Sequence, residues 1–300
     1  HCYCKKCVKN YNEKCRFCSR EIIFYGLNIA SREETLDEII NNKKSLARFG
    51  DGEFNLIFGW NNGFSNSNKT LGNRLMNVLN SNLKNLLIGI YVPYRQSDMK
   101  YLTNSGIKYW ERWFSMVKFK LAKILNKRKK YYSAIISRYY SLYKDKKKFD
   151  VLKYINKLKK IWNNRDLLII EGYFSRNGVG NDLFNNAKSI KRIICPPKNA
   201  FLVYDKIITS IRKFEINKNI LILVSLGQTA SVLSYDLSKL GFQVIDIGHT
   251  DVEYEFYLRK YDKIKKIPYK YVNEAKNGDK NISNVTDINY YKQIFCTILH

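Results

Sequence analysis

Two carboxylates one residue apart, Asp51 and Glu53, lie where an apolar run of strand character changes into an apolar run of helical character, in SLARFGDGEFNLIFG (45–59). Carboxylate oxygens are the ligands that hard divalent cations prefer, and Gly52 between the acids lets another group approach the backbone closely. The pattern therefore predicts a divalent-cation site. A structural interpretation stays open, in which Asp51 caps the helix and Glu53 interacts favourably with the helix dipole.

Polar and acidic residues also follow three other predicted strands, although they are sparse inside the strands. In open α/β sheets, ligands bind beyond the carboxyl ends of the strands, so these residues are candidates for a site. They are Arg176, Gly178, Gly180, Asn181 and Asp182 after 166–172, Gln228 and Thr229 after 219–227, and His249, Asp251, Glu253 and Glu255 after 243–248.

Each of these groups also has a structural interpretation. Gly227-Gln228-Thr229 is either an ordinary strand-to-helix turn with Thr229 as its cap, or a turn whose free N–H groups and helix dipole receive a phosphate. His249 is either a hydrogen-bonded structural histidine or a functional one beside three acids. Those acids are equally typical of the first turn of a helix.

Five of the seven cysteines lie in the first eighteen residues. Four of them have the spacing C-x2-C-x7-C-x2-C, which predicts a structural Zn²⁺ ion held by the thiolates of Cys4, Cys7, Cys15 and Cys18. Redox pairs, or a fragment of an upstream domain, are the alternatives. The chain does not begin with Met, so we expect residues to precede it. Cys195 and Cys296 lie in apolar surroundings and are predicted to be buried thiols.

The 300-residue chain has a formal net charge of +27, from 53 Lys and Arg against 26 Asp and Glu. This balance favours anionic partners, such as nucleic acid, a phospholipid surface or a nucleotide. An AT-rich coding sequence is the alternative explanation, because the basic residues are scattered among many Asn, Ile and Tyr. The densest basic run, 127–148, interleaves Tyr with Lys and suits nucleic acid, a membrane surface or solvated amphipathic helices. No apolar run approaches the roughly 18 residues of a transmembrane helix.

The apolar pattern predicts a helix over 31–43, capped by Ser31, and strands separated by helical segments. Several strands are continuous apolar runs, typical of a parallel sheet covered on both faces, and 219–248 predicts a strand–helix–strand crossover. The predicted strands are 45–50, 85–92, 166–172, 191–197, 219–227 and 243–248. We expect an α/β domain over 21–267 with a Rossmann-like, doubly wound, largely parallel sheet. Around it we expect a Cys-rich segment over 1–20, a basic helical insertion over about 106–165, and a polar tail over 268–300 with little order.

Four blocks of this sequence resemble the signature blocks of one family, the GT-D glycosyltransferases, formerly catalogued as domain of unknown function 1792. They are RFGDGEF (48–54), SRNGVGNDLF (175–184), RIICPPKNAF (192–201) and GQTASVLSYDLSKLGFQVIDIGHTDVEYEF (227–256). The blocks follow the family's order. The resemblance implies the GT-D fold and the transfer of a sugar, as a hexosyltransferase, from a nucleotide-diphosphate donor, usually UDP-linked. The acceptor would be a hydroxyl of a glycan on a surface glycoprotein or polysaccharide.

The resemblance also implies roles for individual residues. Asp51 and Glu53 match the family's Asp-x-Glu motif and would serve Mn²⁺ or Mg²⁺ and the donor, with His249 near the metal and the diphosphate. Glu255 best matches the proposed general base, and Glu253 is the second choice. Further donor contacts are expected from Arg48, Gly52, Arg176, Asn181, Asp182, Gly227, Gln228 and Thr229. Gln228 stands where the family more often has proline, which leaves that turn less rigid.

The chemistry of sugar transfer fits these residue types. A divalent cation offsets the charge that develops on a departing nucleoside diphosphate, and a carboxylate can accept the proton of the attacking hydroxyl. The competing function is a zinc-knuckle nucleic-acid-binding protein with a basic, Tyr-rich surface. It accounts for the charge and the cysteines but not for the acids after the strands, so we do not expect nucleic acid as the partner. A third alternative is a transferase fold kept only as a binding partner. We expect a cytoplasmic location, with the basic helices of 106–165 contacting the inner face of the membrane.

Overall fold

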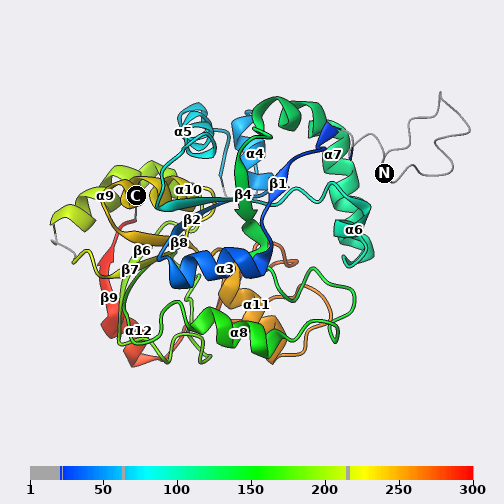
Figure 1. Cartoon of the computed structure of the whole chain (residues 1–300). Coiled ribbons are helices and arrows are strands. Elements are labelled where there is room, and N and C mark those ends of the chain that lie inside the picture. The colour runs from blue at the N-terminus through cyan, green and yellow to red at the C-terminus, as the bar shows by residue number, and fades with distance from the viewer. Residues whose placement is uncertain (1–20, 22, 63–64, 214–216, 300) are drawn as a thin grey trace, which may run out of the picture.

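The computed structural model describes residues 21, 23–62, 65–213 and 217–299. The Cys-rich segment 1–20 and its predicted zinc ligands lie outside the described residues. Nine strands of the described chain form one sheet in the order β1-β4-β3-β2-β8-β7-β5-β6-β9, with every pair parallel (Figure 1). The strands are β1 (Asn28–Ile29), β2 (Ser45–Phe49), β3 (Leu86–Ile90), β4 (Lys130–Ser133), β5 (Asp166–Gly172), β6 (Ser189–Cys195), β7 (Leu221–Ser225), β8 (Gln243–Asp246) and β9 (Ile294–Thr297).

Helices cover both faces of the sheet (Figure 1). The upper layer in Figure 1 holds α4 (Asp51–Ile57), α5 (Lys69–Leu79), α7 (Asn104–Ile124), α9 (Tyr204–Lys213) and α10 (Thr229–Lys239), and the lower layer holds α3 (Arg32–Asn41), α8 (Val151–Lys159) and α11 (Thr250–Leu258). Short helices α6 (Gln96–Met99), α12 (Ile288–Gln293), η1 (Ala134–Ser137) and η2 (Ala200–Val203) complete the connections.

The strands are buried on both sides because alternate residues face different layers. On β5, Leu168 and Ile170 belong to the core under the upper helices, whereas Leu167 and Ile169 belong to the core over the lower ones. This two-sided burial explains the continuous apolar runs of the sequence. None of the described helices combines the length and the apolarity needed to cross a membrane.

The six strands predicted from the sequence are all present, and the helix predicted over 31–43 is α3. Its N-cap is Ser31, whose hydroxyl accepts a hydrogen bond from the backbone N–H of Glu34 at 3.0 Å. The crossover predicted over 219–248 is β7–α10–β8, in which the two strands are parallel neighbours. The predicted doubly wound α/β fold is therefore confirmed.

The connections after β2 and β8 lead to opposite halves of the sheet. After β2 the chain passes through α4 and α5 to β3, on one side, whereas after β8 it passes through α11 towards β9 at the far edge. Because β2 and β8 are neighbours, their carboxyl ends flank a topological switch point, which is where doubly wound sheets bind their ligands.

The segment 106–165 is helical over α7 and α8, but it also contains β4, which pairs with β1 and β3. It is therefore part of the sheet rather than an insertion beside it. The pattern KYYS of β4 is too short and too polar for the apolar periodicity to reveal, because this strand lies near the edge of the sheet.

The segment 268–299, predicted to be a tail with little order, is packed onto the domain. Lys270 and Val272 are buried, the N–H of Tyr271 donates to the carbonyl of Phe174 at 2.9 Å, and β9 extends the sheet beside β6. The prediction was wrong because this segment has few apolar residues, which is typical of a segment with little order. Its buried polar groups instead interact with residues that are distant in the sequence.

Candidate active site

A cleft of about 850 Å³ lies at the carboxyl ends of β2, β7 and β8. Its wall also includes the first turns of α7, the η1 region and residues 271, 273 and 274 of the C-terminal segment. The charged and imidazole side chains among its lining residues are Arg48, Asp51, Glu53, Arg138, Asp246, His249, Asp262, Lys263 and Glu274. The cleft thus brings together groups from four separate parts of the chain.

Asp51 and Glu53 both line the cleft from the first turn of α4. The Oε2 atom of Glu53 accepts a hydrogen bond from the backbone N–H of Gly50 at 2.7 Å, so Glu53 does cap its own helix. Asp51 accepts a hydrogen bond from the hydroxyl of Tyr109 on α7. The structural interpretation of Glu53 is therefore correct in part, because Glu53 caps the helix. Its carboxylate nevertheless also lines the cleft.

Burial raises the pKa of Glu53 to about 7, against the hydrogen bond from Gly50, and the nearby Asp246 carboxylate adds to the rise. Burial also raises the pKa of Asp246, although the neighbouring guanidinium of Arg48 acts in the opposite direction. A cation bound in the cleft would lower both pKa values, because an opposite charge favours the ionised carboxylate.

Arg48 lines the cleft but is committed to the protein. Its Nη2 lies 2.8 Å from Oδ1 of Asp246, its Nε donates to the Asp246 carbonyl at 2.9 Å, and its Nη1 donates to the hydroxyl of Ser137 at 2.7 Å. It therefore positions the cleft floor rather than offering a free guanidinium to a donor. The Arg48 guanidinium can take this position only because residue 248 is glycine, since a Cβ at Gly248 would lie 1.8 Å from Nη2 of Arg48.

His249, Arg138 and Glu274 form a second polar group in the cleft. Arg138 Nη1 donates to Oε2 of Glu274 at 2.9 Å, Nη2 contacts the other oxygen, and His249 Nε2 lies 3.7 Å from Oε1. Burial and the Arg138 charge lower the pKa of His249 to about 3, so its imidazole is neutral. Burial alone would raise the pKa of Glu274, but Arg138 reverses this and holds it at about 2. Arg138 and Glu274 could not be predicted from the sequence, because neither follows a predicted strand.

The turn after β7 also reaches the cleft. Gly227 and Gln228 line it, and Gln228 accepts a hydrogen bond from the hydroxyl of Ser65 at 3.3 Å. Gly52 lies against this turn, since a Cβ at Gly52 would be 2.4 Å from Nε2 of Gln228. Thr229 is buried behind the turn and does not line the cleft, so the predicted donor contact from its side chain is not supported.

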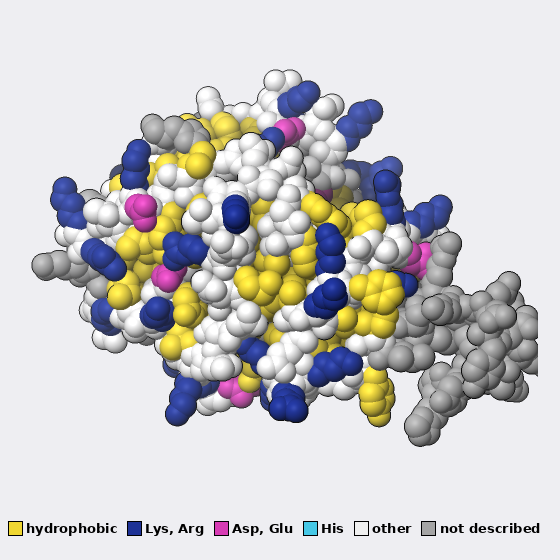
Figure 2. Space-filling view, turned by 90° about the horizontal axis from the view of Figure 1, so that it is seen from above, with side chains coloured by type: hydrophobic (Ala, Val, Ile, Leu, Met, Phe, Trp, Pro, Cys, Tyr) yellow, Lys and Arg dark blue, Asp and Glu magenta, His cyan; other side chains and the backbone are white. Residues whose placement is uncertain are grey.

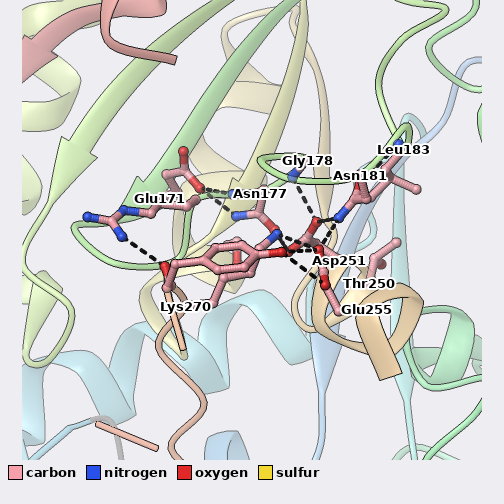
Figure 3. Close-up of polar contacts among 12 residues, drawn as sticks. Glu171, Asn177, Gly178, Asn181, Leu183, Thr250, Asp251, Glu255 and Lys270 are labelled. Carbon is pink, nitrogen blue, oxygen red and sulfur yellow. Dashed lines mark hydrogen bonds and ion pairs between the residues drawn. The ribbon is translucent and has the colours of Figure 1, made fainter. Parts of the chain in front are cut away.

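Glu255 and Glu253, predicted as general bases, do not line the cleft. The oxygens of Glu255 accept hydrogen bonds from Asn181 Nδ2 at 2.8 Å (Figure 3) and from Arg259 Nε at 2.9 Å. Glu253 accepts from the backbone N–H groups of residues 140 and 141 at 2.7 and 2.8 Å. Both carboxylates are buried and occupied by structural partners, so the geometry does not support either as the group that contacts an acceptor.

Three further side chains that were predicted to contact the donor also interact with other parts of the protein. Arg176 is buried, and its Nη1 donates to the carbonyls of Tyr269 and Ser283 at 2.9 and 2.7 Å. Asn181 donates to Asp251 and Glu255 (Figure 3), and Asp182 pairs with Lys159 at 2.6 Å on the surface. None of the three lines the cleft. Their block is nevertheless part of the site, because Ser175 and Asn177 do line it.

Asn177 is held in the cleft wall by hydrogen bonds with Glu171 (Figure 3) and with Arg192, and these two residues form a buried ion pair. Glu171 accepts hydrogen bonds from both the backbone N–H and Nδ2 of Asn177 at 2.7 Å, and it pairs with Arg192 at 2.5 Å. Arg192 Nη2 in turn donates to the carbonyl of Asn177 at 2.9 Å. The side chains of Glu171 and Arg192 are 0% and 3% exposed, so this pair fixes the backbone of the loop rather than contacting solvent.

Among the residues that the structure describes, no group of three or more His, Cys, Asp or Glu side chains is close enough together to bind a metal ion. Asp51, Glu53 and His249 share the cleft without forming a complete coordination shell. The donor set still fits Mg²⁺ or Mn²⁺, because such ions are commonly held by one or two carboxylates together with substrate phosphate oxygens.

The fold and the cleft place this protein among doubly wound α/β domains that bind ligands at the carboxyl edge of a parallel sheet. The chain belongs to the family described as Glycosyltransferase GT-D fold, which matches residues 46–275. The resemblance seen in the four sequence blocks is thereby confirmed.

Individual relatives agree with this assignment. The chain is 36% identical over 274 residues to Glycosyltransferase GlyD of Streptococcus pneumoniae serotype 4, and 35% identical over 278 residues to a probable glycosyl transferase, Gly, of Streptococcus gordonii. Each match covers 91% of this chain but only 33% and 39% of those proteins, so the chain spans little more than a third of their length.

Solved structures match over almost their whole length. A structure described as the distinct glycosyltransferase fold of domain of unknown function 1792 has a TM-score of 0.87 and 36% identity, and the match covers 95% of this chain and 100% of that one. A glycosyltransferase of the same domain from Streptococcus sanguinis has a TM-score of 0.84 and 33% identity, with 91% and 99% covered.

Proposed function

We propose that this chain transfers a sugar, a hexose, from a UDP-linked donor to a hydroxyl of a glycan on a surface glycoprotein or polysaccharide, in the cytoplasm and with a divalent cation. The observation that carries the proposal is that Asp51 and Glu53 after β2, Gly227 after β7 and His249 after β8 line one cleft. That cleft lies at the switch point of a glycosyltransferase family fold.

Asp51 and Glu53 would hold Mn²⁺ or Mg²⁺, with His249 beside them as a neutral ligand or hydrogen-bonding group. The bound ion would offset the negative charge on the departing diphosphate. The raised pKa of Glu53 supports this role, because a carboxyl that lacks a compensating charge gains the most from a cation. Asp246 would add negative charge to the cleft floor, where Arg48 fixes its orientation.

Glu274 is our candidate for the group that accepts the proton of the acceptor hydroxyl, in place of Glu255. Its carboxylate lines the cleft and its side chain is 33% exposed. Arg138 orients it through two hydrogen bonds. Arg138 is committed to Glu274 and Glu253, so, like Arg48, it does not take the diphosphate contact predicted for Arg176.

A donor screen tests the proposal. UDP release from common UDP-sugars would be measured with Mn²⁺, and thermal stability would be measured with UDP, Mn²⁺ and both together. We expect release with one sugar and a rise in melting temperature that needs both ligands, because ligands that bind only the folded state stabilise it. Retention of RNA with a steep salt dependence, and no response to UDP and Mn²⁺, would contradict the proposal and favour a nucleic-acid-binding protein.

A further inference from the structure

The outward face of α7 carries exposed cations and exposed apolar side chains in one row. We call this row the α7 stripe, and its members follow the three- and four-residue spacing of one helix face. They are Lys108, Tyr109, Arg112, Met116, Phe119, Lys120 and Lys123. The opposite face of α7 is buried in the core through Trp113, Phe114, Val117 and Leu121.

The apolar members of the stripe are well exposed. Met116 is 53% and Phe119 is 64% exposed, which is unusual for large apolar side chains on a helix that already has a buried face. Figure 2 looks onto the layer that contains α7, and Lys and Arg side chains stand among hydrophobic ones there.

The cations of the stripe are not neutralised by acids. Within the described chain, Lys108, Arg112, Lys120 and Lys123 form no ion pair, and the single acid of α7, Glu111, is half-buried. Two lysines of α8 differ in this respect, whereas Lys153 and Lys160 in the same region also form no ion pair with any described residue. On α8, Lys157 pairs with Glu33 and Asp37, and Lys159 pairs with Asp182.

We propose that the α7 stripe docks the protein on an anionic phospholipid bilayer. Charge complementarity selects the anionic surface, and the protruding Met116 and Phe119 require a partner with an apolar layer just beneath that charge. A nucleic acid supplies the charge without such a layer. Tyr109 belongs both to the stripe and to the cleft wall, so docking places the mouth of the cleft beside the lipid surface.

Vesicle flotation of the full chain tests this proposal without donor or acceptor, so its result is independent of the proposed function. Vesicles of phosphatidylcholine alone are compared with vesicles that also contain phosphatidylglycerol, at low and at high salt. We expect recovery with the anionic vesicles at low salt and loss of recovery at high salt, because the surface attraction is screened.

Two variants separate the charged and the apolar contributions. Arg112→Gln/Lys123→Gln is expected to lower the partition coefficient roughly 25-fold, since each cation near an anionic surface contributes about fivefold. Met116→Ser/Phe119→Ser is expected to lower it at least roughly tenfold through lost apolar burial. Because these side chains are exposed, both variants should melt at the wild-type temperature.

The matched control is Lys153→Gln/Lys160→Gln, which removes the same charge from exposed positions of the α8 region. It should change the partition coefficient by less than roughly twofold if the stripe is the contact, because surface attraction falls off within a Debye length. Equal recovery with neutral and anionic vesicles, or equal losses for the α7 and α8 variants, would overturn the proposal. So would RNA retention that depends on Arg112 and Lys123 in a chain that does not float.

Discussion

The guanidinium of Arg48 lies 2.8 Å from the carboxylate of Asp246, and this ion pair joins the carboxyl ends of β2 and β8. The side chains are only 15% and 3% exposed, so the pair is a fixed part of the cleft floor. Asp51 follows Arg48 by three residues and His249 follows Asp246 by three. The ion pair therefore sets the relative position of the two segments that carry the proposed cation site.

Gly248→Ala should displace this ion pair. Gly248 has φ +43°, and a Cβ there would lie 1.8 Å from Nη2 of Arg48. Gly59 provides the control, because it has φ +79° and a Cβ added there would meet no atom within 4 Å. Gly59→Ala should cost about 1 kcal/mol of unfolding free energy, the strain of the left-handed conformation. Gly248→Ala should cost at least about 2 kcal/mol more in urea unfolding and should lower UDP release. Equal costs would show that Arg48 is not held in this way.

Asp51→Ala and Glu53→Ala should each lower metal-dependent UDP release by roughly 100-fold or more, because the charge on the leaving group is no longer offset. Asp51→Ala should also abolish the joint stabilisation by UDP and Mn²⁺ in a thermal shift assay. Asp37→Ala is the control, since Asp37 is exposed on α3 and pairs with Lys157 away from the cleft. Wild-type turnover in both cleft variants would remove the proposed cation site.

Glu274→Gln and Glu255→Gln should have different effects. Glu274 faces the cleft, so its amide variant should lower transfer to an acceptor roughly 100-fold while donor binding is kept. Glu255 is buried among Asn181, Arg259 and Lys270, so its variant should mainly reduce the unfolding free energy, by about 1–3 kcal/mol. The measurement is transfer rate and urea unfolding for both variants. A large rate loss for Glu255→Gln at unchanged stability would restore Glu255 as the candidate base.

Glu53 should make stability depend on pH when no divalent cation is present. Its pKa is about 7 in the folded protein against an ordinary value of 4.5, so the folded state binds more protons between these pH values. Wild-type stability should therefore fall as the pH rises through this window, by about 3 kcal/mol relative to Glu53→Gln. Urea unfolding at about pH 4.5 and about pH 8 measures the difference. Parallel pH profiles for wild type and variant would contradict the prediction.

Part of the fold could be predicted from the sequence because it depends on local runs of apolar residues. Six continuous apolar runs became β2, β3, β5, β6, β7 and β8, since strands buried on both faces need apolar residues at every position. The strands β1, β4 and β9 were missed because they are short, lie at or near the edges of the sheet, and depend on a partner strand that is distant in sequence.

The sequence by itself determined the six central strands, the crossover over 219–248 and the position of Asp51, Glu53, Gly227 and His249 at strand ends, because strand and turn patterns are local. Only the tertiary structure decided which polar groups face the cleft. Glu253 and Glu255 point into the protein because packing sets the rotation of α11 about its axis. Arg138 and Glu274 enter the cleft from segments far apart in the chain, and no local spacing records a contact across 136 residues.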